Sequence, residues 1–370
     1  MKGVVGIDIG ATSVRVAEVV GVDSNGFAVV RKLAIAPIGD GAIVAGRVKR
    51  PELVAAAMVR ALKEAGLPRY GVIIGLATPD VAVTQIALPA SVRPEERLTS
   101  VRALGRPIAP TYSLEDSVLA TALSRIENRP DGTSMAIIDL AATRTADFEA
   151  LMEACRMAKI TPRAIDLSGA ALLRALTRAN PSYGETGTVV DIGATKVTIA
   201  TRQGLNLRSV RTVTAGGLDL TKAIMQSSDD DFVAAEKRKM SMRLGANQSA
   251  SLSNTYLNEE FGQTRSPIDD ALLAAADMLV DTIGQAIEAD AANHGSYTQA
   301  ITLCGGSALL RGLKDRVQAR TGVPAAIGRP WAEIERNRRN AQYFKDGRSD
   351  PRVLLAISQA VGLALWRDPA

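Results

Sequence analysis

The sequence predicts an α/β protein with two similar lobes, and three observations support that prediction. The chain has 370 residues, more than one hydrophobic core ordinarily holds, so at least two lobes are expected. Apolar residues make up 46% but aromatic residues only 4%. The core must then be built from Ala, Val, Leu and Ile, which is typical of parallel sheets covered by helices. Finally, a motif near the N-terminus recurs about half a chain later.

The repeated motif is Asp-Ile-Gly-Ala-Thr, which stands at residues 8–12 and again at 191–195. An apolar run precedes each aspartate, and β-branched residues alternate after each threonine (Val14 and Val16; Val197 and Ile199). This pattern predicts a β-hairpin whose turn is Gly-Ala-Thr. Because the spacing is too long for a solenoid repeat, the two copies predict two related domains.

Between the two copies the character of the chain changes. Residues 51–65 have helical spacing before the stop at Gly66 and Pro68, and residues 71–77 form a buried strand pattern. From about 81 to 162 strand and helix patterns mix, which predicts an inserted α+β subdomain. Its expected elements are strands at 81–89 and 135–140 and helices at 93–105 and 145–158. A strand and helix at 165–176 return to the parent sheet.

The second half contains a smaller insertion. The polar, Ser- and Asn-rich stretch 227–263 includes a helix pattern at 231–244. A long helix at 267–292 and a strand at 300–303 follow. The last helix pattern, 351–366, is apolar around most of its circumference, so it is expected to pack into a core and not onto a membrane.

Charge and cysteine content argue against several classes of function. The net charge is +5, but the basic residues are spread along the chain, so nucleic acid is not an expected partner. The densest basic run, Arg336 to Arg339, is expected to be a solvated loop, with contact to an anionic lipid or partner as the alternative. The two cysteines lie far apart and the chain has one histidine, which argues against zinc sites and disulfides.

The hairpin turns give the main chemical prediction. A carboxylate that ends a strand before a glycine-centred turn can hold Mg²⁺, while the N–H groups of the turn approach phosphate. Asp8 and Asp191 occupy that place and are the candidate metal ligands. One such turn is more often an ordinary hairpin, but two matched copies favour a phosphate site. The candidate phosphate-binding residues are Gly10, Ala11, Thr12, Ser13, Gly193, Ala194, Thr195 and Lys196.

A third element is the run Gly305, Gly306 and Ser307 after the strand at 300–303, where two glycines let the backbone lie against a base or ribose. The order of phosphate motif, helix, second phosphate motif, helix and adenosine motif resembles the superfamily of actin, sugar kinases and heat-shock chaperones. The resemblance covers nearly the whole chain. It implies an actin-like (ribonuclease-H-like) two-lobed ATPase fold that holds ATP and Mg²⁺ in its cleft.

Within that superfamily the chain resembles the bacterial branch of the cell-division protein FtsA and the type IV pilus protein PilM. The insertion at 81–162, the Thr-Ala-Gly-Gly run that ends in Gly216 and Gly217, and Ala-Glu-Lys-Arg-Lys at 235–239 carry this resemblance. It implies that Gly216 and Gly217 contact the nucleotide, that Glu236 bonds the ribose hydroxyls and that Lys239 lies beside the adenine. A surface helix with charges at i and i+3 is the alternative for Glu236 and Lys239.

The PilM family is favoured over FtsA because the chain ends at 366–370, without the basic amphipathic membrane helix that FtsA proteins usually append. The resemblance implies a cytoplasmic protein at the inner face of the cytoplasmic membrane, without direct membrane insertion. It would bind the cytoplasmic N-terminal tail of a PilN-like membrane protein in a groove beside 81–162. Self-association into a homo-oligomer is left open.

The expected division of the chain follows from the repeat and the insertions. The first lobe would comprise 1–80, 163–186 and 345–370, and 81–162 would be the inserted, partner-binding subdomain. The second lobe would comprise 187–226 and 264–344, with 227–263 as a small insertion over the adenosine site.

One stretch departs from the family pattern. Where the resemblance implies Val-Asp-Val-Glu-Pro, residues 165–169 are Ile-Asp-Leu-Ser-Gly. Asp166 is retained and is, with Asp8 and Asp191, a candidate catalytic residue. Ser168 replaces the glutamate, and a hydroxyl cannot accept a proton from water near neutral pH. The sequence therefore predicts ATP binding with weak or no hydrolysis, and a role in coupling nucleotide to partner binding.

Two alternatives remain open at this point. One is a filament-forming ATPase like FtsA or MreB. The other is a small-metabolite kinase of the same fold, which needs a catalytic Asp or His near an acceptor hydroxyl. The sole histidine, His294, lies in the later long helix, and no acceptor motif is evident.

Overall fold

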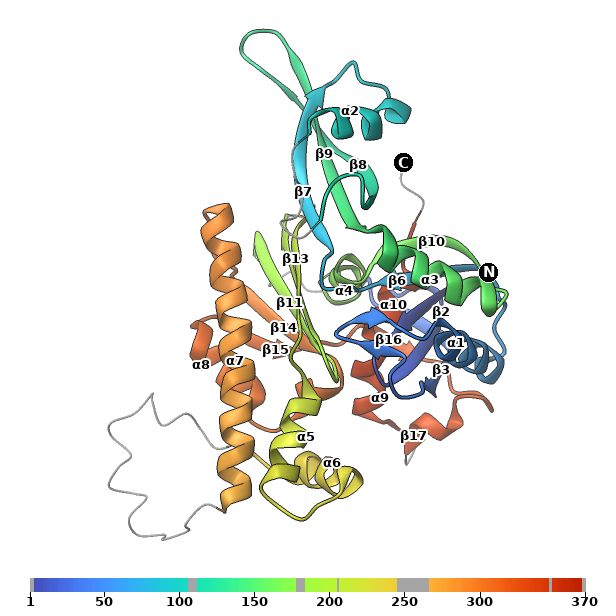
Figure 1. The fold of residues 1–370 in the computed structure, drawn as a ribbon, viewed down its shortest axis with the longest axis vertical. Helices are drawn as coiled ribbons and strands as arrows, with labels where there is room; N and C mark the ends of the chain where they lie inside the picture. Colours follow the sequence, from blue (N-terminus) through green and yellow to red (C-terminus); the bar gives the residue numbers. More distant parts are fainter. Residues whose placement is uncertain are drawn as a thin grey trace.

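The computed structural model describes residues 3–105, 112–177, 184–204, 206–244, 266–345 and 348–367. Two larger sheets lie side by side, and a smaller three-stranded sheet projects beyond them at one end (Figure 1). Each of the two larger sheets contains one copy of the repeated motif.

The first sheet is built around the first hairpin. β1 (Val4–Ile9), β2 (Ser13–Val22) and β3 (Ala28–Pro37) form an antiparallel meander. β6 (Tyr70–Leu76) and β10 (Thr161–Leu167) add in parallel on the other side of β1. One face packs against α1 (Pro51–Ala65) and α3 (Thr145–Met157). The opposite face packs against α10 (Ser358–Ala364).

The second sheet repeats this topology. Its order, β13-β12-β11-β14-β15, matches β3-β2-β1-β6-β10 strand for strand. The strands are β11 (Thr186–Ile192), β12 (Val197–Gln203), β13 (Asn206–Val213), β14 (Ala300–Cys304) and β15 (Ala325–Ile327). The long helix α7 (Pro267–His294), with α5 (Gly217–Gln226) and α8 (Leu313–Thr321), contributes to the core beside this sheet. The predicted pair of related halves is thus visible in the strand order.

The helix α4 (Ser168–Leu176) links the two sheets. It contacts α10 of the first lobe and β11 and β12 of the second. Close packing depends on glycine here. A Cβ added at Gly169 would lie 2.6 Å from a methyl carbon of Val210, and one added at Gly362 would collide with the carbonyl of Ala171.

The inserted sheet has the order β7-β9-β8, with β7 (Ala82–Pro89), β8 (Ser117–Asn128) and β9 (Ser134–Arg144). A short 3₁₀ turn, Pro94–Glu96, and α2 (Arg97–Ala103) accompany it. The sequence did not predict β8. Helix α3, which was expected inside the insertion, packs instead against α1 on the first sheet.

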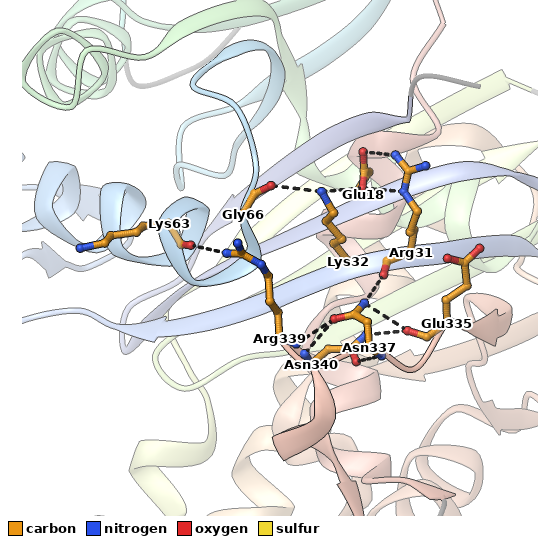
Figure 2. A network of polar contacts seen from close by, with 9 residues as sticks. All are labelled: Glu18, Arg31, Lys32, Lys63, Gly66, Glu335, Asn337, Arg339 and Asn340. Atoms are coloured by element: carbon orange, nitrogen blue, oxygen red, sulfur yellow. Dashed lines mark hydrogen bonds and ion pairs between the residues drawn. The ribbon is translucent and has the colours of Figure 1, made fainter.

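One strand assigned by the sequence to the second lobe belongs to the first sheet. β16 (Trp331–Ile334) pairs in parallel with β3, although 264–344 was expected in the second lobe. The next residues anchor this strand, as Figure 2 shows. The side-chain amide of Asn337 donates to the carbonyl of Arg31 at 2.8 Å, and that of Asn340 donates to the carbonyl of Glu335 at 2.7 Å.

The basic run is docked, in part, against the first lobe. Arg339 donates to the carbonyl of Lys63 in the last turn of α1, where carbonyl groups lack partners within the helix (Figure 2). Lys32 donates to the carbonyl of Gly66 at the same helix end. The Arg336 guanidinium lies 6.0 Å from the centre of the Phe344 ring. The run is an exposed loop, as expected, and Arg339 adds a contact to the end of α1.

The remaining elements are short or lie in the smaller insertion. α6 (Phe232–Ser241) is the predicted helix of that insertion, and most of the rest of 227–263 falls outside the described residues. The expected C-terminal helix is divided into α9 (Pro351–Ala356) and α10. The short elements are β4 (Ile43–Val44), β5 (Arg47–Val48), β17 (Phe344–Lys345), β18 (Arg348–Ser349) and the 3₁₀ turns Gly306–Leu309 and Ala341–Tyr343. No helix in the described part of the chain is long and apolar enough to cross a membrane.

Candidate functional site

The turns of the two hairpins face each other across a narrow cavity of about 30 Å³. Both aspartates of the repeated motif line it, together with the turn residues and the start of the third predicted element. The predicted residues among its lining are Asp8, Gly10, Ala11, Asp191, Gly193, Ala194, Thr195, Lys196, Gly305 and Gly306. The structure thus brings together three segments that the sequence assigned to one site.

A wider cavity of about 380 Å³ adjoins the narrow one, and residues of both hairpin turns line both cavities. Its volume falls in the range of ordinary small-molecule sites. The predicted residues Thr12, Gly217, Glu236, Lys239 and Ser307 line this wider part. Three apolar side chains that the sequence did not single out, Phe232, Met240 and Leu310, line it as well.

The carboxylate of Asp8 is held from two sides. Arg15 donates to its Oδ2 at 2.9 Å, and the side-chain amide of Gln359 donates to its Oδ1 at 2.6 Å. The same amide nitrogen also donates to the hydroxyl of Ser168 at 2.7 Å. Asp8 is 4% exposed, so these bonds satisfy a carboxylate that water hardly reaches.

The carboxylate of Asp191 is less well compensated. Burial in the cleft, followed by the negative charge of Asp8, raises the pKa of Asp191 to about 6, while Arg15 and Lys196 act in the opposite direction. The Cys304 thiol donates a weak hydrogen bond to Asp191 Oδ1 at 3.7 Å. A bound cation would relieve the repulsion between the two carboxylates.

Three groups show that the narrow cavity suits an anion beside that cation. Lys196 extends its ammonium into the cleft. Burial lowers the pKa of Lys196, while the negative charges of Asp8 and Asp191 act in the opposite direction. The hydroxyl of Thr195 and the Nε of Arg15 are buried and have no hydrogen-bond partner within the described ranges. Unpartnered donors of this kind are costly unless a ligand meets them. The residues present therefore fit a phosphate and a divalent cation.

The two glycines of the second connecting motif support the second hairpin turn. Gly217 N–H donates to the carbonyl of Gly193 at 2.9 Å. A Cβ at Gly216 would lie 2.5 Å from the carbonyl oxygen of Ala194, so only glycine fits there. Gly217 lines the wider cavity, whereas Gly216 is absent from the lining of both cavities and acts by holding the turn.

The third element uses its two glycines differently. Gly305 has φ of 85°, and a Cβ there would collide with the Asp191 carboxylate. Gly306 has no heavy atom within 4 Å of an added Cβ among the described residues, and it lines both cavities. Gly305 is thus needed for the backbone, and Gly306 leaves space for a ligand.

The helix α6 brings Glu236 and Lys239 to the wider cavity. Lys239 is 6% exposed, and its ammonium donates to Glu236 at 2.6 Å, to the Thr221 hydroxyl at 2.8 Å and to the carbonyl of Gly217 at 3.0 Å. These bonds place both side chains in the site and not on a solvated surface helix. Their contacts with ribose and adenine stay predictions.

Two predicted residues lie elsewhere. Asp166, a candidate catalytic residue, forms an ion pair with Arg174 and faces a different cavity. Its carboxylate is therefore not available in the cleft. Ser13 supplies only its backbone carbonyl to the first turn, where it accepts from Gly10 N–H at 3.0 Å, and its side chain does not line either cavity.

Two polar residues of the narrow cavity were also missed by the sequence analysis, Arg15 and Gln359. Arg15 could have been found from the hairpin itself, because the register places it directly opposite Asp8. Gln359 lies 351 residues from Asp8 and carries no local signal. Only the packing of α10 against the first sheet brings it to the cleft.

The cavity that contains Asp166 is a groove of about 550 Å³ beside the inserted sheet. β8 and β9 line one side, and β10 with the residues after α10 lines the other. Small and apolar side chains dominate the lining, among them Leu119, Ala120, Ala142, Ile165, Leu365 and Trp366.

Comparison with models of known protein families shows to which family this chain belongs. The model of the family described as type IV pilus assembly protein PilM matches residues 6–368. The chain belongs to this family. Membership confirms the PilM prediction, which the sequence supported through the insertion and the motifs at 214–217 and 235–239.

Solved structures agree on the fold. The chain is similar to the PilM-PilN type IV pilus biogenesis complex, with 24% sequence identity and a TM-score of 0.73, covering 98% of this chain and 97% of that chain. It is also similar to the ethanolamine utilization protein EutJ from Carboxydothermus hydrogenoformans, with 14% identity and a TM-score of 0.54 over 99% and 90% of the two chains. The two-lobed fold predicted from the repeat, and identified as actin-like by resemblance, is confirmed.

The raised pKa of Asp191 makes stability depend on pH in the ligand-free protein. Because the folded-state pKa of about 6 lies above the usual unfolded value of about 4, this group stabilises the fold below pH ~4, and that contribution is lost as the pH rises through about 6. Asp191→Asn stays neutral, beside the same Asp8, Arg15, Lys196 and Cys304. Above pH 7 it should unfold with a free energy on the order of 2 kcal/mol higher than wild type.

Urea unfolding at pH 4.5 and 7.5, without nucleotide, measures this difference. Asp40→Asn, at an exposed carboxylate, is the control and should follow wild type at both pH values. Equal pH dependence in wild type and Asp191→Asn would contradict the assignment of a raised pKa to the partly buried Asp191 carboxylate.

Proposed function

We propose that this protein is the ATP-binding component of the inner-membrane platform that assembles type IV pili. It binds ATP with Mg²⁺ between its lobes and binds the cytoplasmic tail of a PilN-like membrane protein in the groove beside the inserted sheet. It would then lie in the cytoplasm, at the inner face of the membrane, through that partner. The observation that carries the proposal is the adjoining pair of cleft cavities, one lined by charged turns and one by apolar side chains.

The narrow cavity suits the phosphate end of ATP. Asp8 and Asp191 would hold Mg²⁺, which neutralises the charge of the phosphates when bound. Lys196, Arg15 and the Thr195 hydroxyl supply donors that lie beside the two carboxylates. Both turns add backbone N–H groups, because Gly10 and Gly193 keep side-chain atoms away from the phosphate path.

The wider cavity suits the nucleoside. Phe232, Met240 and Leu310 provide apolar surface for a base, and Glu236 offers a carboxylate to the ribose hydroxyls. Lys239 holds Glu236 in place by an ion pair of 2.6 Å. The combination of a charged end and an apolar end matches the two ends of a nucleoside triphosphate.

The groove suits an extended peptide. It lies between the inserted sheet and the first lobe, and its lining combines apolar residues with Asp139, Asp166, Arg174 and Arg367. The related solved structure is that of a PilM-PilN complex, which supports a PilN-like tail as the occupant. A groove whose lining carries both charge signs can fix the direction of a bound peptide.

Slow ATP hydrolysis is expected because the phosphate cavity lacks a free carboxylate among its described lining residues. Asp8 and Asp191 are the carboxylates among its described lining residues, and both are assigned to Mg²⁺. Ser168 is 1% exposed and accepts a hydrogen bond from Gln359, while Asp166 is paired with Arg174. A carboxylate free to act as general base for an attacking water is therefore missing from the described lining of the phosphate cavity.

Gly306→Val tests the nucleotide site. Valine should fold without penalty, because the space beside Gly306 is open, but its methyl groups should occupy the volume that the ligand needs. Saturating ATP with Mg²⁺, at about 100 times its Kd, should stabilise wild type by about 2.7 kcal/mol and stabilise the variant far less. Thermal unfolding with and without ATP and Mg²⁺ measures both effects.

Gly21→Val is the matched control, because its added side chain also has open space but lies on β2 away from the cleft. It should keep the full response to ATP. An unchanged melting temperature of wild type with ATP and Mg²⁺ would refute nucleotide binding. A wild-type response in Gly306→Val would refute the placement of the ligand.

Ala120→Trp tests the groove. Ala120 is an exposed residue of β8 that lines the groove, so a tryptophan there should fill it and weaken peptide binding at least about tenfold, while ATP affinity stays unchanged. Leu123→Trp, at an exposed position of the same strand that does not line the groove, is the control. Fluorescence anisotropy of a labelled peptide from the N-terminal tail of the PilN-like protein measures both. Equal peptide affinities in the two variants would refute the groove as the peptide-binding site.

Single-turnover kinetics test the hydrolysis proposal. Losing a general base typically costs about 10² to 10⁴ in rate, so the isolated protein should turn over ATP far below the roughly 10 s⁻¹ of metabolic enzymes. Asp166→Asn should leave that slow rate unchanged, because Asp166 lies outside the cleft. Turnover of tens per second in wild type, or a rate that collapses in Asp166→Asn, would show that a base does act on the bound nucleotide.

A further inference from the structure

One ammonium group belongs both to the phosphate cavity and to the hinge of the inserted sheet. Lys196 stands at the end of the second hairpin turn and lines the cavity that contains Asp8 and Asp191. Its Nζ crosses the cleft and donates to the carbonyl of Ala77 in the first lobe at 2.9 Å. A lysine ammonium has three donors, and this bond uses one of them.

Ala77 lies where the chain leaves the first sheet for the inserted sheet. It follows β6 directly, and β7 begins at Ala82. Its neighbour Leu76 lines the groove proposed for the partner's tail. The carbonyl that Lys196 holds therefore belongs to the residue next to one that lines the groove.

Polar contacts join the residues that follow Ala77 to the end of β9 and to the first lobe, so a change at Ala77 can reach the inserted sheet. The buried hydroxyls of Thr78 and Thr143 lie 3.3 Å apart, which ties the segment between β6 and β7 to β9, the strand that leaves the insertion. Arg144, at the end of β9, forms an ion pair with Asp80 at 2.8 Å. Arg47 bonds both Asp80 and Asp147, which fixes these residues to the first lobe.

We propose that Lys196 couples nucleotide binding to partner binding, by holding the phosphates of the nucleotide and the Ala77 carbonyl with the same ammonium. This inference rests on the proposed function, since it assumes ATP in the cleft and a peptide in the groove. Without nucleotide, Lys196 Nζ bonds the Ala77 carbonyl with one of its three donors, which leaves the others for a phosphate. A bound phosphate adds a second contact to the same ammonium, which holds Lys196 in place and fixes the hinge.

The coupling is expected to be positive. A hinge already fixed by nucleotide costs the peptide less conformational entropy on binding, so each ligand strengthens the other. Linkage requires that peptide and ATP raise each other's affinity by the same factor. For wild type we expect a factor of at least about five, at the lower end of typical allosteric couplings.

The experiment measures the Kd of ATP with Mg²⁺, by calorimetry, with and without a saturating concentration of the PilN-like tail peptide. Lys196→Met keeps the aliphatic stem but has no ammonium, so its ATP affinity should fall and its coupling factor should drop to within about twofold of one. Thr195→Val is the matched control. This variant should also weaken ATP binding, because it removes a hydroxyl from the same turn, but it should keep the wild-type coupling factor.

Thr78→Val gives a second route that leaves the phosphate cavity intact. It conserves side-chain volume and breaks the contact with Thr143, so ATP alone should bind as to wild type while the coupling factor falls. This variant decides the matter if Lys196→Met binds ATP too weakly to measure.

Two results would overturn the inference: a coupling factor of one in wild type, or a wild-type factor retained in Lys196→Met and in Thr78→Val. Both leave the proposed function standing, because each ligand still binds by itself. Failure of wild type to bind ATP, or to bind the peptide, would refute the proposed function instead.

Discussion

Asp8 and Asp191 repel each other across the cleft, and the arrangement of the surrounding residues depends on that repulsion. Arg15 and Gln359 satisfy the first carboxylate, while the second keeps a raised pKa with only a weak thiol donor beside it. Two carboxylates held together in this way favour a proton or a metal ion between them. The unpartnered Thr195 hydroxyl beside them suits the anion that would accompany the metal.

The duplicated topology explains how one ligand can act on both lobes. Each sheet contributes the same strand order and the same turn, so the two aspartates approach the cleft from opposite sides. The lobes meet through α4 and through the bond from Lys196 to Ala77. A ligand held by both turns therefore adds contacts between the lobes, and the inserted sheet lies next to that junction.

Local sequence patterns predicted much of the fold and of the site. The features that they missed depend on long-range packing. Alternating β-branched residues predicted both hairpins, and the resemblance predicted Glu236 and Lys239, which line the wider cavity. Gln359 and β16 depend on contacts more than 290 residues away along the chain, which no local pattern reports. Asp166 was assigned by resemblance, and only the structure shows that Arg174 holds its carboxylate away from the cleft.

The most direct test of a shared metal and phosphate site uses Mn²⁺ in place of Mg²⁺. Crystals grown with a non-hydrolysable ATP analogue and Mn²⁺ would locate the metal by its anomalous scattering. The account predicts one strong peak between the carboxylates of Asp8 and Asp191, with the phosphates beside Lys196. A nucleotide bound with its metal away from both carboxylates would contradict it.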